Sequence, residues 1–255
     1  MIETIERPPE ILTRDGGVTI AYRQINGKAP SVVFLGGFMS DMQGTKAIEL
    51  ERYCSATGRA FTRLDYRGHG ESSGSFEDGT ISDWFADALA VIEECTDGPL
   101  VLVGSSMGGW IMLLTALARP DRVAGLIGIA AAPDFTRDLM WNQFSEGIRE
   151  TLVRSGVYYE PSEYGDKPYT ITMKLIEDGQ KHLLLDRPIP LHCPVRLLHG
   201  MRDESVPWMT TSRIAGQILS EDVGIFLVKD GDHRLSRDQD IARLLLTLEE
   251  LLQEF

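Results

Sequence analysis

The stretch that decides the fold is residues 100–117, which read LVLVGSSMGGWIMLLTAL. Its first four residues are apolar, as in a strand that is buried on both faces, and its last eight read as an apolar helix. Between them, Gly104 and Gly108 flank Ser106 in a Gly-x-Ser-x-Gly pattern, and these small residues let a strand and a helix approach closely around a strained turn. We therefore predict that Ser106 is an exposed nucleophile, with the helix N-terminus favouring the negative charge that develops beside it.

Other short apolar runs on both sides of this stretch predict a sheet. Strands are expected at residues 32–35, 61–64, 123–129, 195–198 and 225–228, and amphipathic helices at 80–95 and 238–252, the latter capped by Ser236 and Gln239. Alternating strands and helices indicate an α/β fold with a mostly parallel sheet and helices on both faces. Residues 11–25, with two glycines in the middle, predict an antiparallel N-terminal hairpin at the sheet edge.

One segment, residues 133–190, breaks this alternation and is too long for an ordinary connection. We predict that it is an inserted cap, or lid, and that residues 1–132 and 191–255 form the core. Aromatic side chains in this cap are candidates for substrate binding, and packing of the cap onto the sheet explains them equally well. The candidates are Trp141 and Phe144, at the helical spacing continued by Ile148 and Leu152, and then Tyr158 and Tyr159.

A serine hydroxyl needs a general base, and the base needs an acid that orients it. The pattern around Ser106 is typical of a chain order of serine, acid and histidine. Asp203 follows the predicted strand at 195–198, and His233 follows the one at 225–228. We predict Asp203 as the acid and His233 as the base, with Asp134 as the rival acid. The remaining histidines are interpreted as structural: His69, His182, His192 and His199.

Ester chemistry at Ser106 also requires two N–H donors for the oxyanion of the tetrahedral intermediate. The backbone N–H of Met107, next to the nucleophile, is one candidate. The second is the backbone N–H of Phe38, because Gly36-Gly37 lets the chain turn back toward the serine after the strand at 32–35.

The composition restricts the classes of partner and cofactor. The net charge is −13, which disfavours binding to nucleic acid, and three cysteines without a CxxC motif fit a reducing compartment. The histidines lack metal-ligand spacing and no dinucleotide or phosphate loop occurs, so neither a metal nor another cofactor is expected. We expect no membrane span, secretory signal or transit peptide, and hence a cytoplasmic protein.

Taken together, these motifs resemble the α/β-hydrolase family of serine hydrolases. The resemblance is carried by residues 35–38, the DYRGHGES stretch at 65–72, the GSSMGG stretch at 104–109, and the loops of Asp203 and His233. It implies the α/β-hydrolase fold and catalytic roles for Ser106, Asp203 and His233. Many members have His-Gly where this chain has Gly36-Gly37.

A narrower resemblance points to a branch of that family that cleaves acyl-protein thioesters or acyl glucuronides. It rests on residues 44–47, 104–110, 188–190, 193–201 and 206–208, and the chain looks like a bacterial member. The expected reaction is hydrolysis of an acyl thioester or carboxylic ester through an acyl-enzyme on Ser106. The expected substrate is a small acyl ester or an S-acylated protein or peptide. Alternatives are an acyl-glucuronide esterase, a broad carboxylesterase, or a catalytically silent ligand-binding protein.

Overall fold

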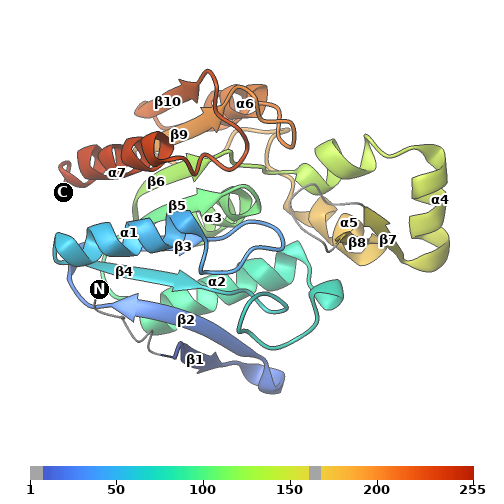
Figure 1. Ribbon diagram of the computed structural model, residues 1–255, viewed down its shortest axis with the longest axis horizontal. Helices are drawn as coiled ribbons and strands as arrows, with labels where there is room; N and C mark the ends of the chain where they lie inside the picture. Colours follow the sequence, from blue (N-terminus) through green and yellow to red (C-terminus); the bar gives the residue numbers. More distant parts are fainter. Residues whose placement is uncertain (1–7, 161–167) are drawn as a thin grey trace.

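A twisted eight-stranded sheet forms the centre of the molecule in the computed structural model, which describes residues 8–160 and 168–255 (Figure 1). The strand order is β1-β2-β4-β3-β5-β6-β9-β10, parallel from β4 to β10. This confirms the predicted mostly parallel sheet. The strands are β1 (Glu10–Thr13), β2 (Thr19–Ile25), β3 (Lys28–Leu35), β4 (Arg59–Leu64), β5 (Leu100–Ser105), β6 (Val123–Ile129), β9 (Val195–Gly200) and β10 (Val223–Val228).

The hairpin expected at one edge is present. Strands β1 and β2 pair antiparallel, and β2 in turn pairs antiparallel with β4. Gly16 and Gly17, in the turn between β1 and β2, both have positive φ, a conformation that glycine adopts without a steric penalty.

Helices cover both faces of the sheet, and each face has its own apolar core. On one face lie α1 (Thr45–Ala56) and α7 (Asp238–Leu252); on the other lie α2 (Ile81–Cys95), α3 (Met107–Ala118) and α6 (Met209–Gln217) (Figure 1). Strand β3 supplies both cores because successive side chains of a strand point to opposite faces. Val32 and Phe34 pack beneath α1, whereas Val33 and Leu35 face the second group of helices.

The helix boundaries follow from their caps. The Thr80 hydroxyl accepts a hydrogen bond from the Asp83 N–H at the start of α2, as the sequence pattern predicted. The cap predicted for α7 was wrong. Instead of Ser236 and Gln239, Arg237 precedes the helix, and its N–H donates to the Asp240 carboxylate at 3.1 Å. The carboxylate of Asp240, in the first helical turn, is a stronger acceptor for this N–H than the Gln239 amide oxygen, because it is charged.

The segment between β6 and β9 lies beyond the carboxyl ends of the parallel strands (Figure 1). It contains a π-helical turn (Thr136–Trp141), α4 (Glu146–Ser155), the antiparallel pair β7 (Val157–Glu160) and β8 (Tyr169–Thr172), α5 (Met173–Gly179), and a 3₁₀ turn (Gln180–His182). Residues 161–167 of the predicted cap and residues 1–7 of the predicted core lie outside the described residues.

Asp134 joins the two ends of this segment. Its carboxylate, fully buried, accepts hydrogen bonds from the N–H groups of Leu184 and Leu185 at 2.8 and 2.9 Å. One carboxylate therefore ties the start of the segment to residues near its end.

Within the described ranges, no helix is both long enough and apolar enough to cross a bilayer.

Candidate active site

Ser106 lies on a tight turn between β5 and α3. Its backbone has φ 55° and ψ −120°, an uncommon conformation for a residue with a side chain. The glycines around it are required by close packing: a Cβ on Gly108 would lie 2.0 Å from the Leu35 carbonyl oxygen, and one on Gly104 would lie 2.4 Å from the Gly108 carbonyl oxygen. The turn thus holds Ser106 at the carboxyl end of β5, above the N-terminus of α3.

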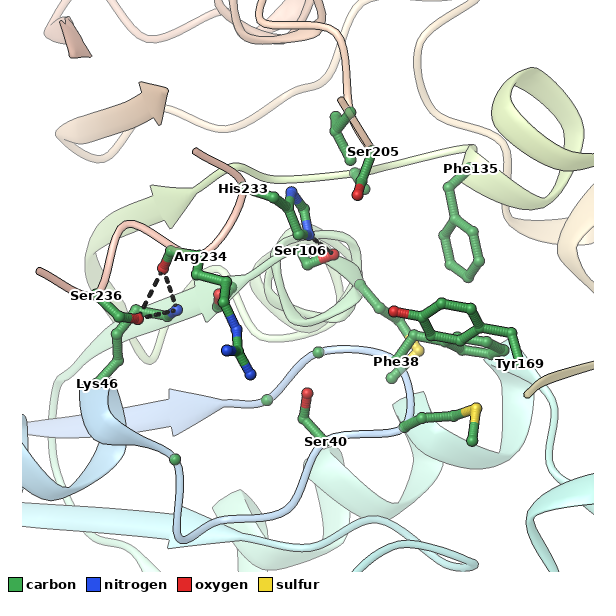
Figure 2. A pocket seen from close by; sticks show the side chains of 18 of the residues that line it. Phe38, Ser40, Lys46, Ser106, Phe135, Tyr169, Ser205, His233, Arg234 and Ser236 are labelled. Atoms are coloured by element: carbon green, nitrogen blue, oxygen red, sulfur yellow. Dashed lines mark hydrogen bonds between the residues drawn. The ribbon is translucent and has the colours of Figure 1, made fainter. Parts of the chain in front are cut away.

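The structure brings Ser106, His233 and Asp203 together, although they are far apart in sequence. His233 Nε2 lies 3.1 Å from Ser106 Oγ, and His233 Nδ1 lies 2.7 Å from Asp203 Oδ2 (the serine contact is drawn in Figure 2). Asp203 follows β9 and His233 follows β10, so both come from loops at the same edge of the sheet as Ser106. This is the geometry that a serine nucleophile, a base and an orienting acid require.

Asp203 is an ionised carboxylate in a nearly solvent-free position. Burial raises its pKa, but hydrogen bonds from His199 and His233, the electrostatic interaction with His233 and the Val206 N–H hold the pKa well below its ordinary value. It is therefore fit to stabilise a positive charge on His233.

Asp134, the rival acid, occupies a different environment. Its hydrogen bonds go to backbone N–H groups, and burial raises its pKa despite those bonds and the nearby Arg137. No hydrogen bond joins it to His233 among the contacts of the described chain.

The two expected oxyanion donors belong to the helix and to the loop that adjoin Ser106. Met107 is the first residue of α3, where a backbone N–H has no partner within the helix. In the loop after β3, a Cβ on Gly37 would lie 3.4 Å from Ser106 Cβ. The chain then turns at Phe38 and Met39, with the Ser40 N–H bonded to the Gly37 carbonyl and Met39 at φ 55°.

A cavity of about 790 Å³ opens over Ser106 and His233, and its two walls differ in character. The apolar wall consists of Phe38, Phe135, Leu139, Met140 and Tyr169. Figure 2 shows the rings of Phe38, Phe135 and Tyr169 gathered on one side of Ser106. The Phe38 ring contacts both of the others, with centroids 5.6 Å from Phe135 and 6.2 Å from Tyr169.

The polar wall includes Ser40, Lys46, Arg234 and Ser236, and Figure 2 shows the last three on the side of Ser106 away from the rings. Lys46 Nζ donates to the Arg234 carbonyl oxygen at 2.6 Å and contacts Ser236 Oγ at 3.4 Å. The first turn of α1 is thereby joined to the loop that carries His233.

The predicted substrate contacts of the cap, Trp141, Phe144, Tyr158 and Tyr159, are not among the residues that line this cavity. The first three pack into a small separate core with Leu152, Ile171 and Ile176. Tyr159 is exposed, and its hydroxyl donates to Glu77. The predicted continuous helix through these positions is also interrupted, because Ser145 starts α4 by accepting a hydrogen bond from the Ile148 N–H.

The side chains that do form the apolar wall were missed in the sequence. Phe135, Leu139 and Met140 belong to or adjoin the π-helical turn, whose wider spacing brings residues five apart onto one side. The five-residue spacing of Phe135 and Met140 indicates a common side only in a π-helical turn, and no sequence pattern around Tyr169 on β8 indicates that it faces the cavity.

The cysteines are free: Cys54 is buried, and Cys95 and Cys193 are partly buried. Within residues 8–160 and 168–255, histidine, cysteine and acidic side chains form no group of three or more that could hold a metal ion.

Comparison with known proteins gives close matches over nearly the whole chain. A family model described as "Serine aminopeptidase, S33" matches residues 28–165. Human ABHD10, named a mitochondrial palmitoyl-protein thioesterase, is 41% identical over 244 residues, covering 95% of this chain and 79% of the human protein. Mouse α/β-hydrolase domain-containing protein 10 superposes with a TM-score of 0.91 at 38% identity, covering 97% of this chain and 99% of that one. A putative hydrolase from Agrobacterium vitis S4 has the same TM-score and identity over 96% and 99% of the two chains.

Proposed function

The chain belongs to the α/β-hydrolase family of serine hydrolases, in the group that includes ABHD10, and on that premise we propose that it cleaves acyl thioesters and carboxylic esters through an acyl-enzyme on Ser106. The observation that carries the proposal is the chain of short contacts from Ser106 Oγ through His233 to Asp203.

The reaction follows from these contacts. Ser106 Oγ attacks the acyl carbon while His233 Nε2 takes its proton, and Asp203 stabilises the imidazolium that forms. The N–H groups of Met107 and Phe38 stabilise the oxyanion. The tetrahedral intermediate collapses, the bond to the leaving group breaks, and His233 returns the proton to the departing thiol or alcohol. A water molecule, deprotonated by His233, then releases the acid and restores the Ser106 hydroxyl.

We propose further that residues 133–190 act as a cap on a core formed by residues 1–132 and 191–255. Phe135, Leu139, Met140 and Tyr169 come from this segment and give the cavity its apolar wall, which suits an acyl chain. The substrate is accordingly an acyl ester or an S-acylated protein or peptide.

An acyl-glucuronide esterase or a broad carboxylesterase is the second candidate. Lys46 and Arg234 on the polar wall favour it, because basic side chains in the cavity would attract an acidic leaving group, although Asp41 and Glu160 also line this cavity. The cytoplasmic location and bacterial origin expected from the sequence stay predictions; orangutan and human ABHD10 are named as mitochondrial.

Labelling with a fluorophosphonate probe tests the nucleophile and discriminates the enzyme from a silent ligand-binding protein. Wild-type protein should become labelled on Ser106, and Ser106→Ala should remain unlabelled and lose nearly all turnover without a change in melting temperature. Unlabelled wild-type protein, or a Ser106→Ala variant that loses only a fewfold in kcat, would refute the assignment.

A panel of acyl thioesters and matched oxyesters of increasing chain length tests the substrate class. Each buried methylene should contribute about 0.8 kcal/mol, or close to fourfold in kcat/KM, until the apolar wall ends. Leu139→Ala should flatten this rise while acetyl ester cleavage persists, and Val153→Ala, at an exposed position of α4, is the matched control. A flat profile for the wild-type protein would favour the glucuronide or broad-esterase function.

A further inference from the structure

Asp203, the acid of the proposed triad, is shared by two histidines. Its Oδ2 atom lies 2.7 Å from His233 Nδ1 and 2.9 Å from His199 Nε2. Its Oδ1 atom accepts the N–H groups of Ser205 at 2.9 Å and Val206 at 2.8 Å. All four donors converge on one carboxylate, so neither its rotation nor its charge is set by His233 alone.

The protonation of His199 follows from its partners. Its Nε2 atom faces two acceptors, Asp203 Oδ2 and the Val206 carbonyl oxygen at 3.0 Å, so Nε2 carries a hydrogen. Its Nδ1 atom lies 2.6 Å from Thr211 Oγ1, on α6, and the Thr211 hydroxyl is the donor when Nε2 alone carries the ring hydrogen. His199 is completely buried on β9, so both ring nitrogens are satisfied by protein groups alone.

We propose that His199 is a positioning residue for the reaction, an inference that rests on the proposed role of Asp203 as the triad acid. Its Nε2–H fixes the rotation of the Asp203 carboxylate toward His233 and shares the negative charge of Oδ2 with it. Thr211 acts one step further out by holding the ring of His199 in the tautomer that donates to Asp203.

Two consequences separate this role from simple core packing. Without the His199 donor, the carboxylate loses an orienting contact, so kcat falls while KM changes little. The charge on Oδ2 is then directed at His233 alone, which favours the imidazolium and moves the acidic limb of the kcat/KM profile to higher pH.

Other charged groups near His233 stay unchanged in this comparison. They are Asp232 and Arg234 on its own loop, and Lys46 of α1, which bonds the Arg234 carbonyl. Thr211 and Val206, which contact His199, are uncharged. A shift in the pH profile of a His199 variant is therefore attributable to the contact between His199 and Asp203.

The test compares His199→Phe, His199→Gln and Thr211→Val with wild-type protein, using 4-nitrophenyl butyrate between pH 5 and 9. Active sites are counted with the fluorophosphonate probe, so that kcat refers to folded enzyme. His192→Gln is the control, because His192 is exposed and its side chain has no contact with Asp203.

The loss of one charge-assisted hydrogen bond predicts a decrease of about ten- to a hundredfold in kcat for His199→Phe, with KM within about threefold and the acidic limb at higher pH. His199→Gln places an amide donor at a similar reach and should recover most of kcat. Thr211→Val should show a smaller decrease in kcat and a smaller shift of the acidic limb to higher pH. If His199→Phe does not fold, Thr211→Val and His199→Gln together provide the test.

The inference is overturned if folded His199→Phe retains kcat within twofold and an unchanged pH profile, or if glutamine is no better than phenylalanine. If His199→Phe does not fold, the inference is overturned by two results together. These are a wild-type kcat and pH profile for Thr211→Val, and a kcat for His199→Gln as low as that of Asp203→Asn. Failure of the proposed function looks different: wild-type Ser106 would remain unlabelled, or Asp203→Asn would be fully active.

Discussion

Replacing Asp203 with asparagine is the sharpest perturbation of the proposed site, because the shape is kept while one acceptor becomes a donor. If the amide oxygen keeps the N–H groups of Ser205 and Val206, the amide NH₂ faces the two histidines. His233 must then present an unprotonated Nδ1 to it. The ring proton moves to Nε2, which lies 3.1 Å from Ser106 Oγ and can no longer accept the serine proton.

The same substitution is tolerated by His199. Its ring can move its proton to Nδ1 and donate to Thr211 Oγ1, leaving Nε2 to accept from the new amide. The fold should therefore survive the change, and the damage should fall on the step that His233 performs.

The expected loss in kcat is about 10⁴-fold, the size found for a wrong histidine tautomer in a serine protease triad. At 1.36 kcal/mol for each tenfold, this is about 5 kcal/mol in activation free energy. The assay is steady-state hydrolysis of a short acyl thioester, with Ser106→Ala protein as the background. KM should change by no more than a fewfold.

Asp134→Asn is the matched control. Asp134 is equally buried, but its carboxylate accepts backbone N–H groups and not an imidazole. It should lower the free energy of unfolding by about 1–3 kcal/mol and leave kcat within about tenfold. A larger loss of kcat for Asp134→Asn than for Asp203→Asn would assign the acid to the end of β6 and refute the proposed geometry.

Three further outcomes are expected. Phe38→Leu should keep kcat within about tenfold, whereas Phe38→Pro, which deletes the N–H, should cost about a hundredfold or more in folded protein; equal losses in kcat would show that the ring matters more than the amide. Gly108→Ala should lower both the melting temperature and kcat, since its Cβ would lie 2.0 Å from the Leu35 carbonyl oxygen, and Gly36→Ala, whose Cβ meets no atom within 4 Å, should do neither; equal melting temperatures would contradict this. Burial lowers the pKa of Lys46 to about 8, so the folded state binds fewer protons than the unfolded chain between about pH 8 and 10, and the group favours folding more as pH rises through that window. Thermal melts should therefore show the Tm of Lys46→Met decreasing relative to wild type from pH 7 to 10, and a constant difference would contradict the lowered pKa.

The sheet could be predicted from the sequence because its strands are marked locally. A strand buried on both faces must be largely apolar, as β5 is. The glycines at its end are required because the turn that follows is closely packed. The family resemblance drawn from these motifs is confirmed by the 41% identity to human ABHD10.

The residues of the proposed triad could also be chosen from the sequence, because chain order and strand ends restrict the candidates. His199 could not be recognised as a partner of Asp203 in this way. It lies inside β9, and its contact depends on how the loop after the strand folds back over it.

The residues of the cavity wall could not be predicted from local sequence patterns, for a different reason. Aromatic residues at helical spacing pack a small core as readily as they line a channel, and Phe144 and Tyr158 do the former. Which side chains face the cavity is decided by the interruption before Ser145 and by the π-helical turn, and these depend on contacts distant in sequence.

The bond between Asp134 and the backbone at Leu184 and Leu185 has a consequence for how such an enzyme diversifies. Because these bonds hold the two ends of the segment together, a change in length between the bonded points does not alter the distance between its ends. Lengthening a loop adds little closure entropy. Substitutions and insertions in the segment would therefore alter Phe135, Leu139, Met140 and Tyr169 of the apolar wall, while Phe38 and the residues of the proposed triad stay on the core.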